Sequence, residues 1–455
     1  MLGSFLDFIQ RRYIWQPPER ALKLYEKVPR IILERFRVMN LRHTVRLAAA
    51  KSVFYSAEFE KYAVEIKSVA APKDLFPITT SEKDLIGTAA NRFICARPDT
   101  AFESTGTTSK TPKRVFFSNR ELEDAGRIGA AGLWRLGVRP EDRAVSSFDY
   151  SFWVSGPALK SALSLLGAFH IEAGRMDPAD FYDRVKSYQC NVIVSDPGWL
   201  VRLSEIAEKR GPWPVKLLIA GGENLSEISR KYVEAVWQAK LILSYGQTEA
   251  FGMIGLECSE QSGYHVNDMD LWVEVPTADR DGYGELVYTT LRRSVMPLLR
   301  YRSGDVTRII TEPCRCGMAS MRLAKLKGRA DDLAVTSVGN IAPWMFDEAM
   351  EACGLRAAEW QVRLGQSGKR DRIEFWAELA APVSPDDLRA KILQGMKQAM
   401  PVAFGGIQQG LAEFIAKPCI AGDLRQGRKV RRIVDERDFA QKGEAAAEAS
   451  RPVAV

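Results

Sequence analysis

Residues 215–250 read VKLLIAGGENLSEISRKYVEAVWQAKLILSYGQTEA, and their pattern is the strongest indication of the fold. A short apolar run ends in GGE, a helical stretch follows from Leu225 to Gln238, and a second apolar run ends in YGQTE. NVIVSDP, at residues 191–197, is a similar apolar run upstream. Short apolar runs that alternate with helices predict parallel strands, whose ligands bind at the carboxyl ends of the strands. GGE and YGQTE both fall at such ends.

A polar segment, STGTTSKTPK at residues 104–113, is a candidate phosphate loop. In a loop opened by glycine, hydroxyl and backbone N–H groups donate to phosphate oxygens, and the lysines offset the charge of a nucleotide. The segment differs from the Walker loop, because no second glycine stands at the required spacing. A solvated Ser/Thr-rich turn is the alternative interpretation of these residues taken alone.

The composition is that of a globular protein with a sizeable core. A chain of 455 residues, 46% of them hydrophobic, predicts more than one domain. The net charge of +7 comes without a long basic run, which argues against nucleic-acid binding. The N-terminus lacks the pattern of a secretory leader, and no run of about 18 apolar residues predicts a membrane span. We therefore expect a cytoplasmic protein, in which the seven cysteines are thiols or metal ligands.

Three further segments follow the candidate phosphate loop in order: SYGQTEA at residues 244–250, LLRYRSGD at 298–305 and KGRADD at 327–332. Together, the four segments resemble the adenylate-forming superfamily of acyl-CoA synthetases and non-ribosomal adenylation domains, over roughly residues 75–437. GGE at 221–223, CRCG at 314–317 and RIVD at 432–435 resemble its phenylacetate-CoA ligase-like branch.

The resemblance implies an α/β fold with a large N-terminal adenylating domain and a small mobile C-terminal α/β domain. The large domain would combine parallel sheets wrapped by helices with a β-rich subdomain that contains GELVYTTL (284–291) and PLLRYRSGD (297–305). In the small domain, RIEFWAEL (372–379) and LAEFIAKP (411–418) predict strands, and SPDDLRAKILQGMKQAM (384–400) predicts a helix. We expect a helical lead-in over residues 1–70, the rest of the large domain over 71–330, the small domain over 331–440 and a frayed tail over 441–455.

The chemistry that the resemblance implies has two half-reactions. A carboxylate attacks the α-phosphate of ATP to give an acyl-adenylate and pyrophosphate, with Mg²⁺ as cofactor. A thiol, of CoA or of carrier-protein phosphopantetheine, then attacks the activated carbonyl. The nucleotide-binding residues would be Ser104, Thr105, Gly106, Thr107, Thr108, Lys110, Gly221, Gly222, Glu223, Tyr245, Gly246, Asp305 and Arg329.

Two acidic residues and a threonine have the most specific roles in this set. Thr248 would contact the α-phosphate, Glu249 would be a magnesium ligand, and Asp305 would accept hydrogen bonds from the ribose hydroxyls. The alternatives are a solvated loop acid at Glu249 and a strand-end turn aspartate at Asp305.

Two catalytic residues are predicted at and beyond the end of the large domain. Asp331 matches the hinge residue of the family, with a helix N-cap or a metal site as alternatives, and Gly339 resembles the glycine of the thiol tunnel. Counting back from Asp435 places Lys429 at the position of the lysine that bridges carboxylate and α-phosphate. The local pattern departs from the family, so Arg428, Arg431 and Arg432 could share this role, and a solvated basic surface remains an alternative.

Cys258, His265, Cys314 and Cys316 form a candidate zinc set. Three thiolates and an imidazole make a structural site, because four protein ligands leave no open position. Relatives in the phenylacetate-CoA ligase-like branch resemble this arrangement. The alternative is a buried apolar thiol at Cys258 and a hydrogen-bonded core histidine at His265.

The acyl pocket is assigned to Tyr150, Phe152, Trp153 and Gly246, and its aromatic side chains favour an aromatic acid. These side chains could also be ordinary core, and a medium fatty acid or an amino acid remains open. Two other functions compete with an acid–CoA ligase: a stand-alone enzyme that loads a carrier protein in natural-product biosynthesis, and a non-catalytic nucleotide-binding protein. The sequence leaves the oligomeric state open, with a homodimer as one candidate.

Overall fold

The computed structural model describes residues 17–104, 112–330, 334–367, 370–425 and 430–437. The chain divides into two compact units. The first unit comprises Met1–Leu225 and Arg230–Ala330, and the second comprises Ser226–Ser229 and Asp331–Val455.

The centre of the first unit is a nine-stranded sheet with the strand order β13-β14-β9-β8-β7-β6-β5-β3-β4. The strands β4, β3, β5, β6 and β7 are parallel, and the sheet continues antiparallel from β7 onward. Their bounds are β3 (Arg143–Ser146), β4 (Phe169–Glu172), β5 (Val192–Ser195), β6 (Leu217–Gly221), β7 (Lys240–Gln247), β8 (Gly252–Leu256), β9 (Tyr264–Val266), β13 (Ile309–Ile310) and β14 (Arg322–Leu323).

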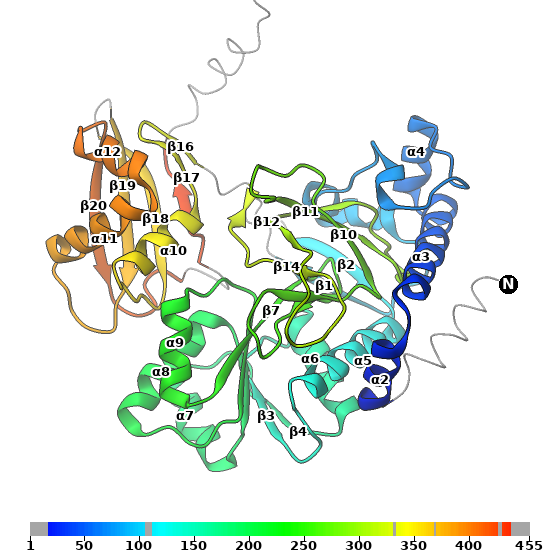
Figure 1. The fold of residues 1–455 in the computed structure, drawn as a ribbon, viewed down its shortest axis with the longest axis horizontal. Helices are drawn as coiled ribbons and strands as arrows, with labels where there is room; N and C mark the ends of the chain where they lie inside the picture. The colour runs from blue at the N-terminus through cyan, green and yellow to red at the C-terminus, as the bar shows by residue number, and fades with distance from the viewer. Residues whose placement is uncertain (1–16, 105–111, 331–333, 368–369, 426–429, 438–455) are drawn as a thin grey trace, which may run out of the picture. The chain divides into compact units, whose positions relative to one another are not determined.

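Helices cover both faces of the parallel strands, as Figure 1 shows, with α7, α8 and α9 on one face and α5 and α6 on the other. Their bounds are α5 (Asn119–Arg135), α6 (Ser155–Leu166), α7 (Pro178–Val185), α8 (Pro197–Arg210) and α9 (Glu227–Trp237), with a 3₁₀ turn at η5 (Lys186–Tyr188). Leu133 and Leu163 from the helices pack with Val192 and Ile219 from the strands in one buried cluster. Burial on both faces explains why β5 and β6 are continuous apolar runs.

The β-rich part of the first unit is an antiparallel sheet with the order β10-β11-β12-β15. Its strands are β10 (Leu271–Glu274), β11 (Gly284–Thr290), β12 (Tyr301–Thr307) and β15 (Gly328–Arg329). The strand predicted from residue 297 begins only at Tyr301, because Arg300 has a φ of 46°, which is incompatible with a strand. A separate hairpin pairs β1 (Thr100–Ser104) with β2 (Lys113–Phe117).

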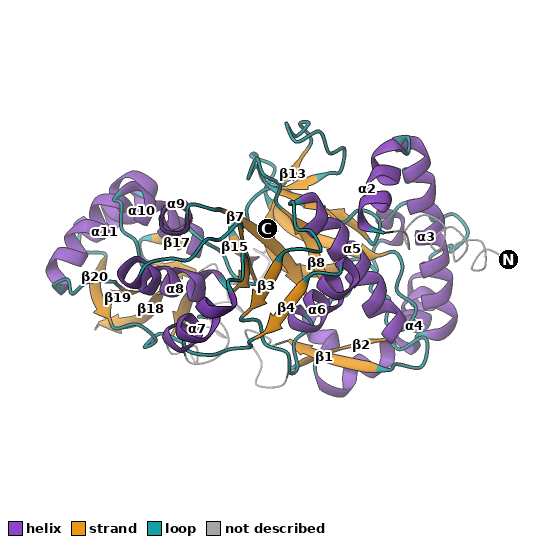
Figure 2. Cartoon of the chain, turned by 90° about the horizontal axis from the view of Figure 1, so that it is seen from below, coloured by secondary structure: helices purple, strands orange, loops and turns teal. Residues whose placement is uncertain are grey.

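The described N-terminal part of the first unit is helical. It contains α2 (Pro18–Lys27), α3 (Arg30–Lys51) and α4 (Val53–Tyr62), followed by the 3₁₀ turns η2 (Pro72–Leu75), η3 (Glu82–Leu85) and η4 (Gly87–Phe93). Helix α2 packs against α5, which lies beside it in Figure 2. Helix α3 is tied to the β-rich sheet, because Thr44 Oγ1 donates to the carbonyl of Leu291 at 2.9 Å.

The second unit has its own sheet with the order β20-β19-β18-β21, together with a small β16–β17 hairpin. Its elements are β16 (Ala334–Thr336), β17 (Gly339–Ile341), α10 (Pro343–Ala352), β18 (Trp360–Ser367), β19 (Arg370–Glu378), α11 (Pro385–Ala399), α12 (Pro401–Gln408), β20 (Ala412–Cys419) and β21 (Ile433–Asp435). The predicted helix is α11, which begins after Ser384, whose side chain accepts from the Asp387 N–H. The hydrophobic core of the second unit contains the buried side chains of Phe346, Phe375 and Ile392.

The fold class is therefore confirmed as α/β with parallel strands, covering helices and a β-rich part. The predicted division of the first 330 residues and the predicted tail stay predictions. Residues 438–455 lie outside the described part of the chain. Within the described residues, no helix combines the length and apolarity that a membrane span requires.

Candidate functional site

The carboxyl ends of β6 and β7 bring backbone close to backbone at two predicted glycines. A Cβ on Gly246 would lie 1.9 Å from the carbonyl oxygen of Gly252, and one on Gly221 would lie 3.1 Å from that of Ser244. The pairing of β7 with β8 shifts between Tyr245 and Gly246. Glycine at 246 is therefore required by the fold, apart from any contact with a ligand.

Asp305 on β12 accepts hydrogen bonds from two residues of β7. The Tyr245 hydroxyl and Gln247 Nε2 each donate to Asp305 Oδ2 at 2.7 Å. Burial first, and the neighbouring Asp305 second, raise the pKa of Tyr245 well above its ordinary value. The phenol therefore stays protonated and fixes the orientation of the carboxylate. Gln247 was not among the predicted site residues, although it stands inside the YGQTE segment.

Arg329 lies next to Asp305 because β15 pairs with β12, with Asp305 opposite Arg329. Its Nη1 lies 3.7 Å from Asp305 Oδ1 and donates to the carbonyl of Ser303 at 3.2 Å. Gly304 has a φ of 75°, and a Cβ there would lie 2.4 Å from Arg329 Nη2. The glycine of the RSGD segment thus makes room for the arginine of the GRADD segment.

Glu249 follows β7 and is 2% exposed. Its Oε1 lies 2.6 Å from Lys113 Nζ and accepts hydrogen bonds of 3.2 Å from Ser104 Oγ and from the Tyr301 hydroxyl. Burial alone would raise the pKa of Glu249, but the adjacent Lys113 holds it below the ordinary value. The carboxylate is therefore ionised inside the protein. A solvated loop acid, the alternative interpretation of Glu249, is excluded by this burial.

Lys113 and Tyr301 were not among the predicted site residues. Lys113 is the last residue of the quoted STGTTSKTPK segment, and Tyr301 lies in LLRYRSGD, so both had a sequence signal. Ser104 and Lys113 face each other as the last pair of the β1–β2 hairpin. The hairpin therefore holds both ends of the predicted phosphate loop beside Glu249. Thr105, Gly106, Thr107, Thr108 and Lys110 lie outside the described residues.

The remaining nucleotide residues occupy the same strand ends. Gly222, with a φ of 95°, and the half-buried Glu223 follow β6 directly. Thr248 is buried in the turn after β7, where its carbonyl accepts from the Phe251 N–H at 3.1 Å. In the second unit, Gly339 opens β17 with a φ of 101°. Asp331 and Lys429 lie outside the described residues.

The aromatic residues of the predicted acyl pocket follow β3, whereas Gly246 lies on β7. Tyr150 is half-buried, and a Cβ on Gly156 would lie 2.8 Å from its ring. Phe152 is 63% exposed, so ordinary core packing is excluded for its side chain. The Phe152 carbonyl accepts from the Glu103 N–H at 2.9 Å, which ties this segment to the hairpin strand that carries Ser104.

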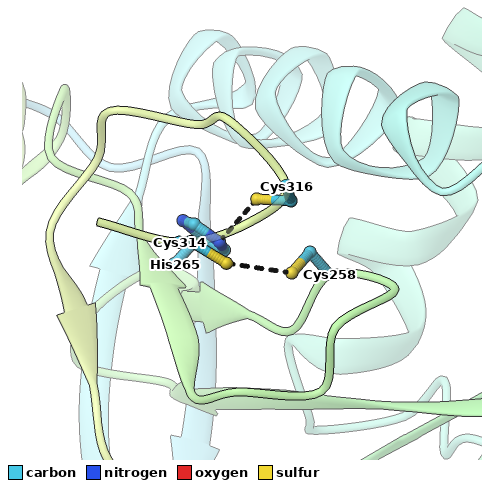
Figure 3. Close-up of side chains that lie close together, drawn as sticks. All are labelled: Cys258, His265, Cys314 and Cys316. Atoms are coloured by element: carbon cyan, nitrogen blue, oxygen red, sulfur yellow. Dashed lines mark hydrogen bonds between the residues drawn. The ribbon is translucent and has the colours of Figure 1, made fainter. Parts of the chain in front are cut away.

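The four predicted zinc ligands converge in the first unit, as Figure 3 shows. Their potential ligand atoms all lie within 4.8 Å of one another. Cys258 Sγ and Cys314 Sγ are 3.7 Å apart. Cys316 Sγ lies 3.2 Å from His265 Nε2. Two thiolates on one tetrahedral zinc would be about 3.8 Å apart for Zn–S bonds of about 2.3 Å, so the sulfur spacing fits.

The surroundings of this cluster favour a neutral imidazole. Burial, followed by the charges of Arg135 and Arg322, lowers the pKa of His265 to about 4. His265 Nδ1 is hydrogen-bonded to Ser320 Oγ at 2.9 Å, so Nε2 is the nitrogen that faces Cys316. A hydrogen bond on the other ring nitrogen commonly orients a histidine that binds a metal. The donor set fits structural zinc.

We predict one tightly held zinc ion per chain at this cluster. Cys316→Ser should lower the midpoint of thermal unfolding by about 5 °C or more, because metal binding and folding are coupled in such sites. Adenylation at low temperature should fall much less. Metal analysis of protein purified without a metal-binding tag provides the measurement. Cys95→Ser is the matched control, because Cys95 is a half-buried thiol outside the cluster. Near-zero zinc in the wild-type protein would contradict the prediction.

The sequence was compared with those of known proteins. No protein-family model matches the sequence. A phenylacetate-coenzyme A ligase from Thermus thermophilus is 26% identical over 374 residues, which cover 78% of this chain and 84% of that protein. Another phenylacetate-coenzyme A ligase, from Escherichia coli, is 23% identical and covers 76% of this chain and 82% of its own. The sequence is therefore similar to phenylacetate-coenzyme A ligases over about three quarters of its length.

Solved structures show the same fold. A 2-hydroxyisobutyryl-CoA ligase in the postadenylation state has a TM-score of 0.76 at 17% identity and covers 93% of this chain and 94% of its own. An anthranilate CoA ligase has a TM-score of 0.56 at 13% identity and covers 77% of this chain and 68% of its own. The protein is accordingly an enzyme of the AMP-forming acid–thiol ligase class.

Proposed function

We propose that this protein joins a carboxylic acid, aromatic in character, to the thiol of CoA by way of an acyl-adenylate. The strongest support is that site residues predicted from separate sequence segments contact one another in the fold. Tyr245 and Arg329 contact Asp305, while Glu249 contacts Ser104 at the edge of the phosphate loop. A non-catalytic nucleotide-binding protein would have no need for a buried, ionised Glu249.

In the first half-reaction, a carboxylate oxygen of the acid attacks the α-phosphorus of ATP and the bond to pyrophosphate breaks. Asp305 would accept from the ribose hydroxyls, and Gly221, Gly222, Glu223 and Tyr245 would flank the adenine. Thr248 would contact the α-phosphate, and the residues from Ser104 to Lys110 would hold the β- and γ-phosphates. Mg²⁺, when held by Glu249, would neutralise charge on the phosphate oxygens.

In the second half-reaction, the thiol sulfur attacks the acyl carbon and AMP leaves. Gly339 would line the path of the pantetheine, and Asp331 would be the hinge that brings the second unit into this pose. CoA is the proposed acceptor because the similar proteins above are named as CoA ligases. Transfer to a carrier protein remains the alternative that the experiment below also tests.

The proposal of an aromatic acid rests on the segment after β3. Tyr150, Phe152 and Trp153 follow one another within four residues, and an aromatic pair contributes about 0.5–1.5 kcal/mol beyond burial. The curated relatives carry phenylacetate in their names. Cytoplasmic location and a homodimeric state remain predictions from the sequence.

Acid-dependent exchange of labelled pyrophosphate into ATP tests the proposed function. The panel should contain phenylacetate, benzoate, hydroxylated aryl acids, medium-chain fatty acids and amino acids, followed by trapping with CoA or with a phosphopantetheinylated carrier protein. We expect the highest kcat/KM with an aryl acid and transfer to CoA. Preference for an aliphatic acid would overturn the aromatic proposal, and transfer only to the carrier protein would overturn the CoA proposal.

Asp305→Asn is expected to weaken ATP binding by about 10-fold to 100-fold, because a hydrogen bond to a charged acceptor contributes about 1.5–3 kcal/mol. The measurement is the KM for ATP in pyrophosphate exchange, checked by calorimetry with AMP. Asp281→Asn is the matched control, since Asp281 is exposed on the loop between β10 and β11. Equal ATP affinities in the two variants would contradict the role of Asp305.

A further inference from the structure

A row of alternating charges crosses the first unit between the predicted nucleotide and magnesium residues. Arg329 Nη2 lies 3.4 Å from Glu82 Oε2, and Lys113 Nζ lies 3.6 Å from the same oxygen. Lys113 Nζ also lies 2.6 Å from Glu249 Oε1. The side chains are 21%, 19%, 9% and 2% exposed in the order Arg329, Glu82, Lys113 and Glu249. Sequence patterns had assigned a role only to the two ends of this row.

Lys113 and Glu82 are both held by their backbone surroundings. The first residue of β2 is Lys113, which faces Ser104 across the hairpin and forms a bridge with Ile86, just beyond η3. At the start of η3, the N–H and the hydroxyl of Ser81 both donate to Asp84 Oδ2, at 2.8 and 2.9 Å. The ammonium group therefore lies between two carboxylates that come from different elements.

The two carboxylates do not share Lys113 equally. Its distance to Glu249 is within hydrogen-bonding range, whereas its distance to Glu82 is that of an ion pair. A compact ammonium on a flexible stem can move between two such acceptors without breaking a fixed geometry. A divalent cation on Glu249 would repel this ammonium, because like charges a few ångströms apart repel strongly inside a protein.

We propose that Lys113 is a shared cation that holds Glu249 until the metal binds, and that Glu82 is a positioning residue that receives Lys113 when it leaves Glu249. This inference rests on the proposed role of Glu249. It assigns a function to Glu82, which lies in η3 and in none of the sequence motifs quoted above.

The contact with Arg329 links this exchange to the nucleotide. When Arg329 turns toward a ribose or phosphate oxygen, Glu82 Oε2 loses this cation and becomes a better acceptor for Lys113. Nucleotide and metal then favour each other's binding through Glu82, and this coupling must be reciprocal.

Glu82→Gln is the decisive variant. It removes the second acceptor and one negative charge, so the metal affinity should fall by on the order of tenfold for the loss of one ion-pair partner. Metal-free ATP should bind as tightly as before or more tightly, because the site becomes more positive. A purely structural role would weaken metal and ATP binding together.

The direct readout is Mn²⁺ binding by electron paramagnetic resonance, with a non-hydrolysable ATP analogue and without the acid, so that no turnover is needed. ATP binding is measured by calorimetry in chelator, and thermal unfolding checks the fold of each variant. Glu103→Gln is the matched control, because Glu103 pairs with Arg114 on the same hairpin and makes no ion pair with Lys113 within the described residues. Glu82→Asp keeps the charge and should give an intermediate Mn²⁺ affinity.

Weaker Mn²⁺ binding with undiminished ATP binding supports the inference. Unchanged Mn²⁺ binding in Glu82→Gln, or equal loss of Mn²⁺ and ATP binding, overturns it. If the wild-type protein shows no acid-dependent ATP–pyrophosphate exchange, the proposed function fails. The comparison of Mn²⁺ binding between the wild-type protein and Glu82→Gln still decides the role of Glu82.

Discussion

Lys429→Ala is expected to lower acid-dependent ATP–pyrophosphate exchange by about 10²–10³, the usual effect of removing one charge-stabilising contact. Thioester formation from supplied acyl-adenylate should persist. The reason for this difference is that the lysine would bridge carboxylate and α-phosphate only in the adenylating pose. Both half-reactions should be measured on one protein preparation.

The structure describes Arg431 and Arg432, which compete with Lys429 for the role of bridging carboxylate and α-phosphate. Arg432 lies 3.0 Å from Glu359 and donates to the carbonyl of Trp360 at 2.8 Å, so it is already engaged within the second unit. Arg431 is exposed and stays a competing candidate, so Arg431→Ala is measured beside Lys429→Ala. If Lys429→Ala exchanges pyrophosphate at the wild-type rate while Arg431→Ala does not, the alignment from Asp435 is wrong. If neither variant changes the rate, Arg428 becomes the candidate.

Asp331→Pro is expected to abolish thioester formation while pyrophosphate exchange persists. Arg329 ends the last strand of the first unit and Ala334 begins the first strand of the second, so Asp331 lies in the segment that joins these two strands. Proline fixes φ near about −65° and also restricts the residue before it, which would trap one pose. The measurement is the ratio of the two half-reaction rates.

Asp331→Ala is the control for the hinge prediction, because it removes the carboxylate and leaves the backbone free to rotate. It should retain thioester formation. Loss of both half-reactions in Asp331→Pro, with a lowered unfolding temperature, would indicate misfolding. Retention of both would mean that the small domain does not swing about this residue.

Three strands of the parallel sheet could be predicted because they are largely buried and read as apolar runs. The strands expected within residues 191–197, 215–223 and 239–246 are β5, β6 and β7. The antiparallel continuation was not predicted. Strands β13 and β14 have two residues each and exist only through long-range pairing, which leaves no periodic pattern in the sequence.

The site could be predicted where a motif fixes both the residue and its surroundings. Asp305, Arg329 and Glu249 lie in such motifs. The four predicted zinc ligands also lie in such motifs. Glu82 could not be predicted, because its place beside Lys113 depends on how η3 packs against the start of β2. Tyr301 and Gln247 stand inside quoted motifs, but only the fold shows that they contact Glu249 and Asp305.

The most direct test of the central claim is to follow heavy oxygen from the carboxylate of the acid. The best acid from the exchange panel, labelled in both carboxylate oxygens, is incubated with the protein, ATP, Mg²⁺ and CoA, and the nucleotide products are analysed by mass spectrometry. If the acid attacks the α-phosphate, one heavy oxygen must appear in AMP and the other in the acyl thioester. Unlabelled AMP, or ADP together with labelled inorganic phosphate, would contradict an acyl-adenylate and with it the account given for this site.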